Sequence, residues 1–180
     1  QLYQVVPVAA PTDEEKLHHY LWRFWRHIPR DGDTTIFDRS WYGRVLVERV
    51  EKYATGNEWR RAYNEINDFE HQLTEHGNIV VKFWLHISAE EQLRRFQARE
   101  TTEHKTYKIT DDDWRNRSKR AAYKKAVNEM IDRTDTPAAR WHIIPAEDKI
   151  WARIAIMKQY CATLEKALHK QKQQFPTEKK

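Results

Sequence analysis

The sequence has 180 residues, which suits one domain with a hydrophobic core. Its net charge of +5 favours an anionic ligand but is too small to indicate nucleic acid, and we expect no nucleic-acid partner. No apolar run approaches the roughly 20 residues of a membrane helix, so no membrane partner is expected. Cys161 is the only cysteine, which excludes a disulfide within the chain and favours a cytoplasmic protein. It falls on an apolar helical face and is predicted to be buried.

Strand and helix patterns alternate along the chain, which predicts an α/β fold with a parallel sheet. The predicted strands cover residues 3–8, 34–37, 79–87 and 141–145. The predicted helices cover about 13–28, a stretch from 44 onward, 57–76, 89–100, 111–134 and 150–168. Capping boxes are expected at Thr12 with Glu15 and at Ser88 with Glu91, and Asn57 is expected to cap the third helix.

The second predicted strand is followed directly by Asp38 and Arg39. Because open α/β sheets bind ligands beyond the carboxyl ends of their strands, Asp38 is a candidate ligand of Mg²⁺ at a phosphate site. The guanidinium groups of Arg39 and Arg44 match phosphate geometry. The alternatives are a plain salt bridge between Asp38 and Arg39, and for Glu48 either nucleotide binding or an ion pair with Arg44 or Lys52.

A second basic group lies near the middle of the chain. Arg95 and Arg99 are four residues apart and share one face of the fourth predicted helix. With Lys105 and Lys108 in the polar loop that follows, they could close over a phosphate chain as a lid. The alternative is ordinary exposed helix charge.

The stretch Thr35-Ile36-Phe37-Asp38-Arg39-Ser40-Trp41-Tyr42, with Arg44 and Val47-Glu48-Arg49-Val50, resembles the Walker B region of the polyphosphate kinase 2 family. The resemblance continues at 81–85, 91–96, 107–110 and 132–134 and covers nearly all of residues 3–165. The stretches 22–27 and 38–50 are most similar to the polyphosphate:AMP phosphotransferase branch, in which two such domains are fused and the C-terminal one is active. The chain resembles the end of that C-terminal domain.

The resemblance implies transfer of the terminal phosphate of inorganic polyphosphate to AMP, giving ADP, with Mg²⁺. It also implies a P-loop kinase-like parallel sheet with helices on both faces. The partial domain would cover residues 1–169, with a helical lid at about 89–120 and a flexible tail at 170–180. The implied catalytic residues are Asp38, which also holds the metal, Arg39 and the lid arginine Arg99; the implied substrate-binding residues are Arg44, Glu48, Arg95, Lys105 and Lys108.

The glycines mark a departure from the family pattern. The sequence has four glycines and none is followed by lysine, so the Gly-rich Walker A loop that cradles phosphate is missing. We expect that loop and the family's central first strand before Gln1, a gap or exposed edge in the sheet, and no catalysis by these residues alone. The alternative functions are an ATP-dependent nucleoside monophosphate kinase of the thymidylate-kinase type and a non-catalytic polyphosphate-binding domain. A homo-oligomer is compatible with each of these functions.

Overall fold

The computed structural model describes residues 2–101 and 111–174, which divide into two compact units. Unit 1 comprises residues 1–72 and 119–134, and unit 2 comprises residues 73–118 and 135–180. Unit 1 contains β1 (Tyr3–Pro7), α1 (Asp13–Lys16), α2 (Trp22–Trp25), β2 (Thr34–Asp38), the 3₁₀ helix η1 (Trp41–Val45), α3 (Val47–Val50), most of α4 (Gly56–Glu75) and α7 (Arg120–Thr134). Unit 2 contains β3 (Lys82–His86), α5 (Ala89–Glu100), α6 (Asp111–Ser118), β4 (Trp141–Pro145) and α8 (Lys149–Gln174).

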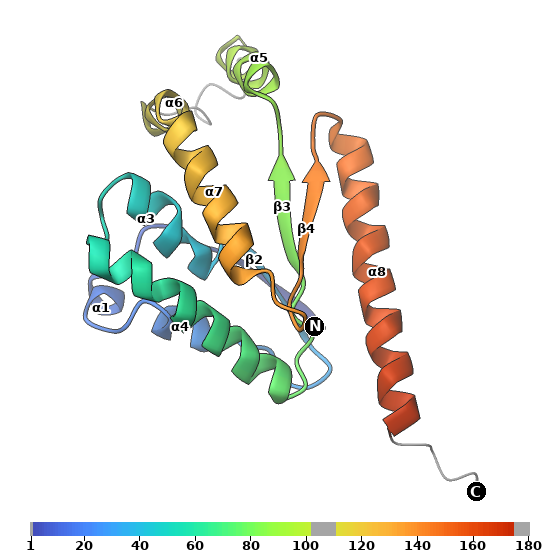
Figure 1. Cartoon of the computed structure of the whole chain (residues 1–180). Helices are drawn as coiled ribbons and strands as arrows, with labels where there is room; N and C mark the ends of the chain where they lie inside the picture. Colours follow the sequence, from blue (N-terminus) through green and yellow to red (C-terminus); the bar gives the residue numbers. More distant parts are fainter. Residues whose placement is uncertain (1, 102–110, 175–180) are drawn as a thin grey trace, which may run out of the picture. The chain divides into compact units, whose positions relative to one another are not determined.

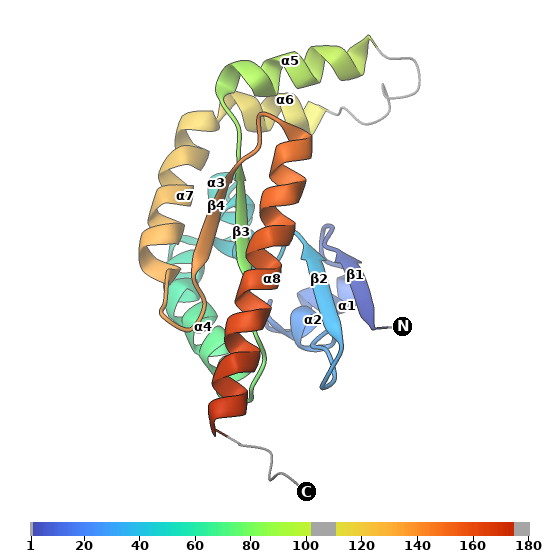
Figure 2. The same ribbon diagram turned by 90° about the vertical axis from the view of Figure 1, so that its right-hand side faces the viewer.

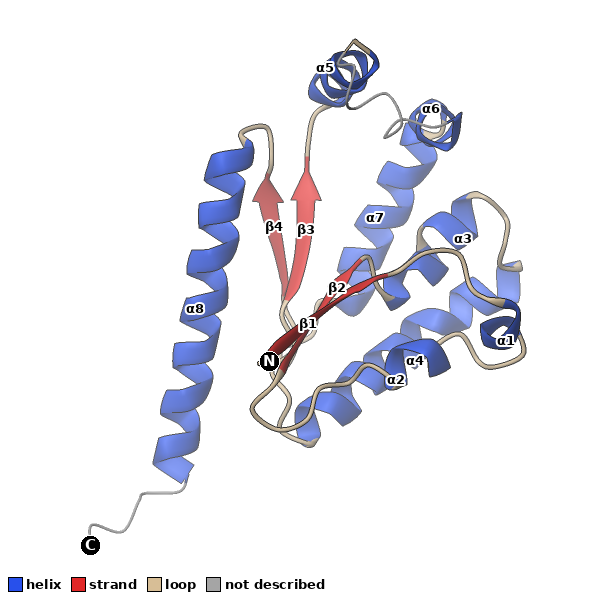
Figure 3. Cartoon of the chain, turned by 180° about the vertical axis from the view of Figure 1, so that it is seen from behind, coloured by secondary structure: helices blue, strands red, loops and turns tan. Residues whose placement is uncertain are grey.

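The four predicted strands are present, and they pair in parallel as two separate two-stranded sheets. In unit 1 the strands β1 and β2 lie side by side (Figure 3). Their parallel register runs from Tyr3 opposite Thr34 to Pro7 opposite Asp38. In unit 2 β3 and β4 lie side by side in the same direction (Figure 1). The predicted α/β class with parallel strands is therefore confirmed. The expected gap or exposed edge in the sheet stays a prediction, because the two strand pairs belong to different units.

The core of unit 1 is built from aromatic rings around Trp41. The Trp41 ring lies edge-on to Phe24, Phe37 and Phe69, with centroid distances of 5.7, 5.4 and 5.0 Å. Edge-to-face pairs add about 0.5–1.5 kcal/mol each beyond the area that they bury. These rings join α2, β2, η1 and α4, so they fix the segment that follows β2.

Helix α4 buries the apolar face that its sequence predicts. Ala62, Tyr63, Ile66 and Phe69 are all at most 2% exposed. The predicted cap was wrong, because Thr55 forms the capping box: its hydroxyl accepts from the Glu58 N–H, and the Glu58 carboxylate accepts from the Thr55 N–H.

Unit 2 packs α8 along the β3–β4 pair (Figure 2). Ile144, Ala146 and Ala152 form the buried centre, with Phe83 and Ile156 packed against it. Helices α5 and α6 are joined by the edge-to-face rings of Phe96 and Trp114 and by a hydrogen bond from Arg117 to the Ala89 carbonyl. The described residues include no helix that is long and apolar enough to cross a membrane.

Several predicted helix bounds were wrong. The helix expected over 13–28 is split into α1 and α2, and Leu17 between them is 85% exposed. The reason is tertiary: Leu21 and Phe24 enter the core, and the chain bends before them instead of continuing one apolar stripe. The helix expected over 111–134 is interrupted before α7. Helix α8 extends to Gln174, so 170–174 are helical, and 175–180 lie outside the described residues.

Cys161 was also predicted wrongly. It lies on α8 and is exposed. The apolar pattern of α8 is wider than the face that packs on the sheet, since Ile154 and Met157 are 51% and 59% exposed as well. A pattern that is apolar on more than one side does not show which side faces the core.

Candidate functional site

Asp38 is the last residue of β2 and Arg39 bends the chain directly after it, and together they form the Asp38–Arg39 turn. The Val8 N–H donates to the Asp38 carbonyl at 3.0 Å, which fastens the turn to the chain leaving β1. Arg39 has φ of 65°, a left-handed conformation that costs about 1–2 kcal/mol for a residue with a side chain. Both side chains are exposed, and within the described residues neither makes a hydrogen bond or ion pair. Within the described part of the chain, the alternative of a salt bridge between Asp38 and Arg39 is therefore not what the structure shows.

Arg44 is held in η1 by two neighbours. Its Nη1 lies 3.0 Å from the Glu48 carboxylate, and its guanidinium stacks 4.5 Å from the centre of the Tyr20 ring. The ion-pair alternative for Glu48 is thus confirmed. Burial raises the pKa of Glu48 above its ordinary value, against the opposing charges of Arg44 and Arg23. In the described structure the Arg44 Nε is buried without a hydrogen-bond acceptor, so this group retains an unused donor.

A buried carboxylate that the sequence analysis missed supports the same segment. Glu70 is 1% exposed, and its Oε1 accepts hydrogen bonds from Trp41 Nε1 at 3.0 Å and from the Tyr42 hydroxyl at 2.7 Å. Burial, and then the Glu70 charge, raise the pKa of the Tyr42 phenol. Hydrogen bonds to a charged group contribute about 1.5–3 kcal/mol each, so the two together exceed the strain of about 1–2 kcal/mol at Arg39. The signal was present in the sequence, because Glu70 lies on the apolar stripe of α4, four residues after Ile66.

The two predicted lid arginines differ in their surroundings within unit 2. The Arg95 Nε lies 2.6 Å from the Glu91 carboxylate, and its Nη2 donates to the carbonyls of Ala146 and Glu147. Arg95 therefore joins α5 to the segment after β4. Arg99 is half-buried and has no hydrogen bond or ion pair among the described residues.

The predicted site residues are divided between the two units. Asp38, Arg39, Arg44 and Glu48 fall within one segment of unit 1, whereas Arg95 and Arg99 belong to α5 in unit 2. The remaining two predicted residues, Lys105 and Lys108, lie outside the described residues.

Asp38 fits a Mg²⁺ site as a single ligand. Among residues 2–101 and 111–174, no three His, Cys, Asp or Glu side chains are grouped to hold a metal ion. Mg²⁺ is often held by one or two carboxylates together with phosphate oxygens and water. An exposed carboxylate at a strand end, free of other described contacts, meets that requirement.

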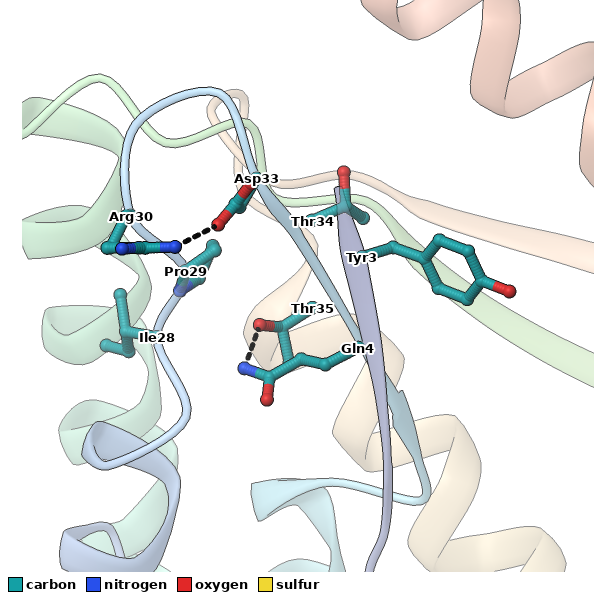
Figure 4. A pocket seen from close by; sticks show the side chains of 8 residues that line it. All are labelled: Tyr3, Gln4, Ile28, Pro29, Arg30, Asp33, Thr34 and Thr35. Atoms are coloured by element: carbon teal, nitrogen blue, oxygen red, sulfur yellow. Dashed lines mark hydrogen bonds and ion pairs between the residues drawn. The ribbon is translucent and has the colours of Figure 1, made fainter. Parts of the chain in front are cut away.

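One pocket of unit 1 lies away from this turn. A pocket of about 320 Å³ is lined by Tyr3, Gln4, Ile28, Pro29, Arg30, Asp33, Thr34 and Thr35 (Figure 4). It lies at the amino ends of β1 and β2, where the Gln4 amide donates to the Thr35 hydroxyl at 2.9 Å. Ligands of parallel α/β sheets bind at the opposite ends. We therefore place the candidate site at Asp38 and Arg39 and not in this pocket.

Comparison with known proteins finds relatives over almost the whole chain. The family model for polyphosphate kinase 2 matches residues 1–173. Curated relatives named polyphosphate:AMP phosphotransferase, from Pseudomonas syringae pv. tomato and Pseudomonas aeruginosa, are 58% and 55% identical over 94% of this chain. The chain spans 34% of the length of each.

Solved structures agree in fold. A crystal structure from Pseudomonas aeruginosa PA01, assigned to polyphosphate kinase 2, superposes with a TM-score of 0.91 and 54% identity over 94% of this chain and 36% of that one. The polyphosphate kinase 2 structure from Arthrobacter aurescens TC1 gives 0.88 and 40% over 91% of this chain and 58% of that one. The motif around Asp38, the parallel strand pairs and these matches agree, and the chain belongs to the polyphosphate kinase 2 family.

Proposed function

We propose that the protein containing these residues transfers the terminal phosphate of inorganic polyphosphate to AMP. The observation that carries the proposal is the turn at Asp38 and Arg39, which presents an acid and a base without other described contacts at the carboxyl end of a parallel strand. Curated relatives more than half identical to the chain bear the name of this activity. In the reaction the terminal phosphoanhydride bond breaks and a new bond forms to an oxygen of the AMP phosphate, giving ADP and a polyphosphate one unit shorter.

Each charged residue has a role in this proposal. Asp38 holds Mg²⁺, which supplies neutralisation of phosphate charge when bound. Arg39 binds the phosphate chain, and Arg44, already stacked and paired, orients phosphate or nucleotide with Glu48 beside it. Arg99 closes over the phosphate chain from α5 as part of a lid at about 89–120. Charge neutralisation and alignment are the main requirements of phosphoryl transfer, which needs little covalent chemistry from the protein.

The remaining fold features belong to the same proposal. The chain is part of a P-loop kinase-like domain at 1–169, with Lys105 and Lys108 as further lid residues and Arg95 bracing α5. None of the four glycines precedes a lysine, so these 180 residues hold no Gly-Lys pair of a Walker A loop. Residues 1–180 by themselves should then give no ADP.

The test is an assay of the full-length protein with AMP, Mg²⁺ and either polyphosphate or ATP as donor, with ADP measured by chromatography. We expect ADP from polyphosphate, and Asp38→Asn, which keeps the shape of the side chain but removes its charge, should lower turnover by roughly 10²-fold or more. Activity with ATP alone would instead indicate a nucleoside monophosphate kinase. An unchanged rate for Asp38→Asn would contradict the assignment of Asp38.

A further inference from the structure

Two contacts anchor the segment that follows the Asp38–Arg39 turn, and both end on one atom. Trp41 and Tyr42 begin η1 three and four residues after Asp38, and they are 8% and 4% exposed. Their polar atoms both donate to Oε1 of Glu70, at 3.0 and 2.7 Å. A single buried carboxylate oxygen on α4 therefore fixes two consecutive residues beside the turn.

The residue before the turn, Phe37, is also linked to α4, through the Trp41 ring. Phe37, directly before Asp38, lies edge-on to Trp41, and Trp41 lies edge-on to Phe69, the neighbour of Glu70. The residues on both sides of the turn thus depend on the placement of the Trp41 ring. The left-handed φ of Arg39 lies between these two anchors.

We infer that Glu70 is a positioning residue of the phosphate site, which acts through Trp41 and Tyr42 to hold Asp38 and Arg39 in their reactive geometry. This rests on the proposed function for the reaction that the geometry serves. An apolar side chain could fill the same volume, but it would leave two buried donors without this acceptor. The carboxylate therefore sets the position of the turn as well as filling the core.

Tyr42→Phe and Tyr63→Phe form a matched pair for the test. Each variant removes one buried hydroxyl from unit 1 that is hydrogen-bonded to a charged side chain: Tyr42 to Glu70, and Tyr63 to Arg49 at 2.8 Å. Only Tyr42 adjoins the turn. We expect similar losses of thermal stability, but a fall in kcat of about tenfold to a hundredfold for Tyr42→Phe alone, because a small misplacement of reacting groups is costly.

Two further measurements separate positioning from plain stability. The concentration of Mg²⁺ that gives half-maximal activity should rise in Tyr42→Phe more than the KM for AMP does. Hydrogen exchange of peptides covering 36–44 should be faster in Tyr42→Phe than in Tyr63→Phe. Glu70→Gln, which keeps an acceptor oxygen on a side chain of the same size, should retain more activity than Glu70→Leu.

The outcomes distinguish the two proposals. If the wild-type protein makes ADP and Tyr42→Phe has the same kcat and the same exchange at 36–44 as Tyr63→Phe, the role of Glu70 is refuted while the function stands. If the wild-type protein makes no ADP, the proposed function fails, and the exchange of 36–44 alone decides whether Glu70 holds the turn. Should Glu70→Leu fail to fold, Tyr42→Phe and Glu70→Gln still decide the question.

Discussion

Arg39 combines a strained backbone with the charge proposed to bind phosphate. Lys52 is the other residue with a side chain that has positive φ, at 62°, among the described residues. Strain at a non-glycine residue persists only where the surroundings enforce it, and it is often found at functional sites. The two residues therefore allow backbone strain to be separated from side-chain function.

Replacing either residue by glycine should relieve the strain. We expect Arg39→Gly and Lys52→Gly each to raise the free energy of unfolding by about 1 kcal/mol or less, after the greater flexibility of glycine in the unfolded chain is subtracted. Only Arg39→Gly should lose turnover, because it removes a proposed phosphate ligand. Denaturant titration and the ADP assay measure the two effects. Equal activity of the two variants would remove Arg39 from the site.

Arg99 and Arg94 test the proposed lid on the same helix. Arg94 is an exposed residue paired with Glu91 on the surface, whereas Arg99 has no described partner. Arg99→Ala in the full-length protein should lower kcat by ~10³-fold or more, since an arginine on a transferring phosphate can contribute that much. Arg94→Ala, the control, should stay near the wild-type rate. Comparable losses in both variants would mean that α5 is merely destabilised.

At the scale of elements, Arg95 links α5 to the segment after β4, and the Glu91 carboxylate on the same helix holds Arg95 in a pH-sensitive clamp. Hydrogen bonds from Arg94 and then Arg95 lower the pKa of Glu91 to about 2. In the unfolded chain this carboxyl takes up its proton near 4.5. Because the folded pKa is the lower one, the stabilisation is fully present above pH 4.5 and is lost as the pH falls toward 2.

The clamp predicts how Glu91→Gln responds to pH. The variant should have a lower thermal midpoint than wild type at pH 6 to 7, and the difference should narrow as the pH is lowered below about 4.5. Glu90→Gln removes the neighbouring acid from the same first turn of α5 and is the matched control for the helix dipole. A difference that is constant from pH 7 to pH 3, or equal in both variants, would count against the clamp.

Elements could be predicted from the sequence where the signal is local. The four strands, the Thr12–Glu15 capping box and the end of α4 before Gly77, whose φ is 104°, were predicted correctly. The second expected box was only half right: Ser88 accepts from the Glu91 N–H, but Glu147 takes the Ser88 N–H while Glu91 binds arginine. Such partners come from distant parts of the chain, and local spacing does not reveal them.

The whole molecule shows the same distinction between local and long-range information. The motif from Asp38 to Glu48 was sufficient to suggest the family, which the comparisons then showed. The sequence did not show that Arg95 would bind the carbonyls of Ala146 and Glu147, or that Glu70 would receive two donors from residues 28 and 29 positions earlier. Periodicity states which side of a helix is apolar, but a contact requires knowledge of the opposing surface.

The exposed position of Cys161 on α8 has a practical consequence for handling the protein. Cys161 is the only cysteine among these 180 residues. A disulfide between two copies of this chain must therefore join the Cys161 of one copy to the Cys161 of the other. Residues 1–180 kept in air without a reductant should therefore show a band of twice the monomer mass on a non-reducing gel. The band should vanish with dithiothreitol and be absent from Cys161→Ser. A sizing experiment without reductant would then mistake oxidation for assembly.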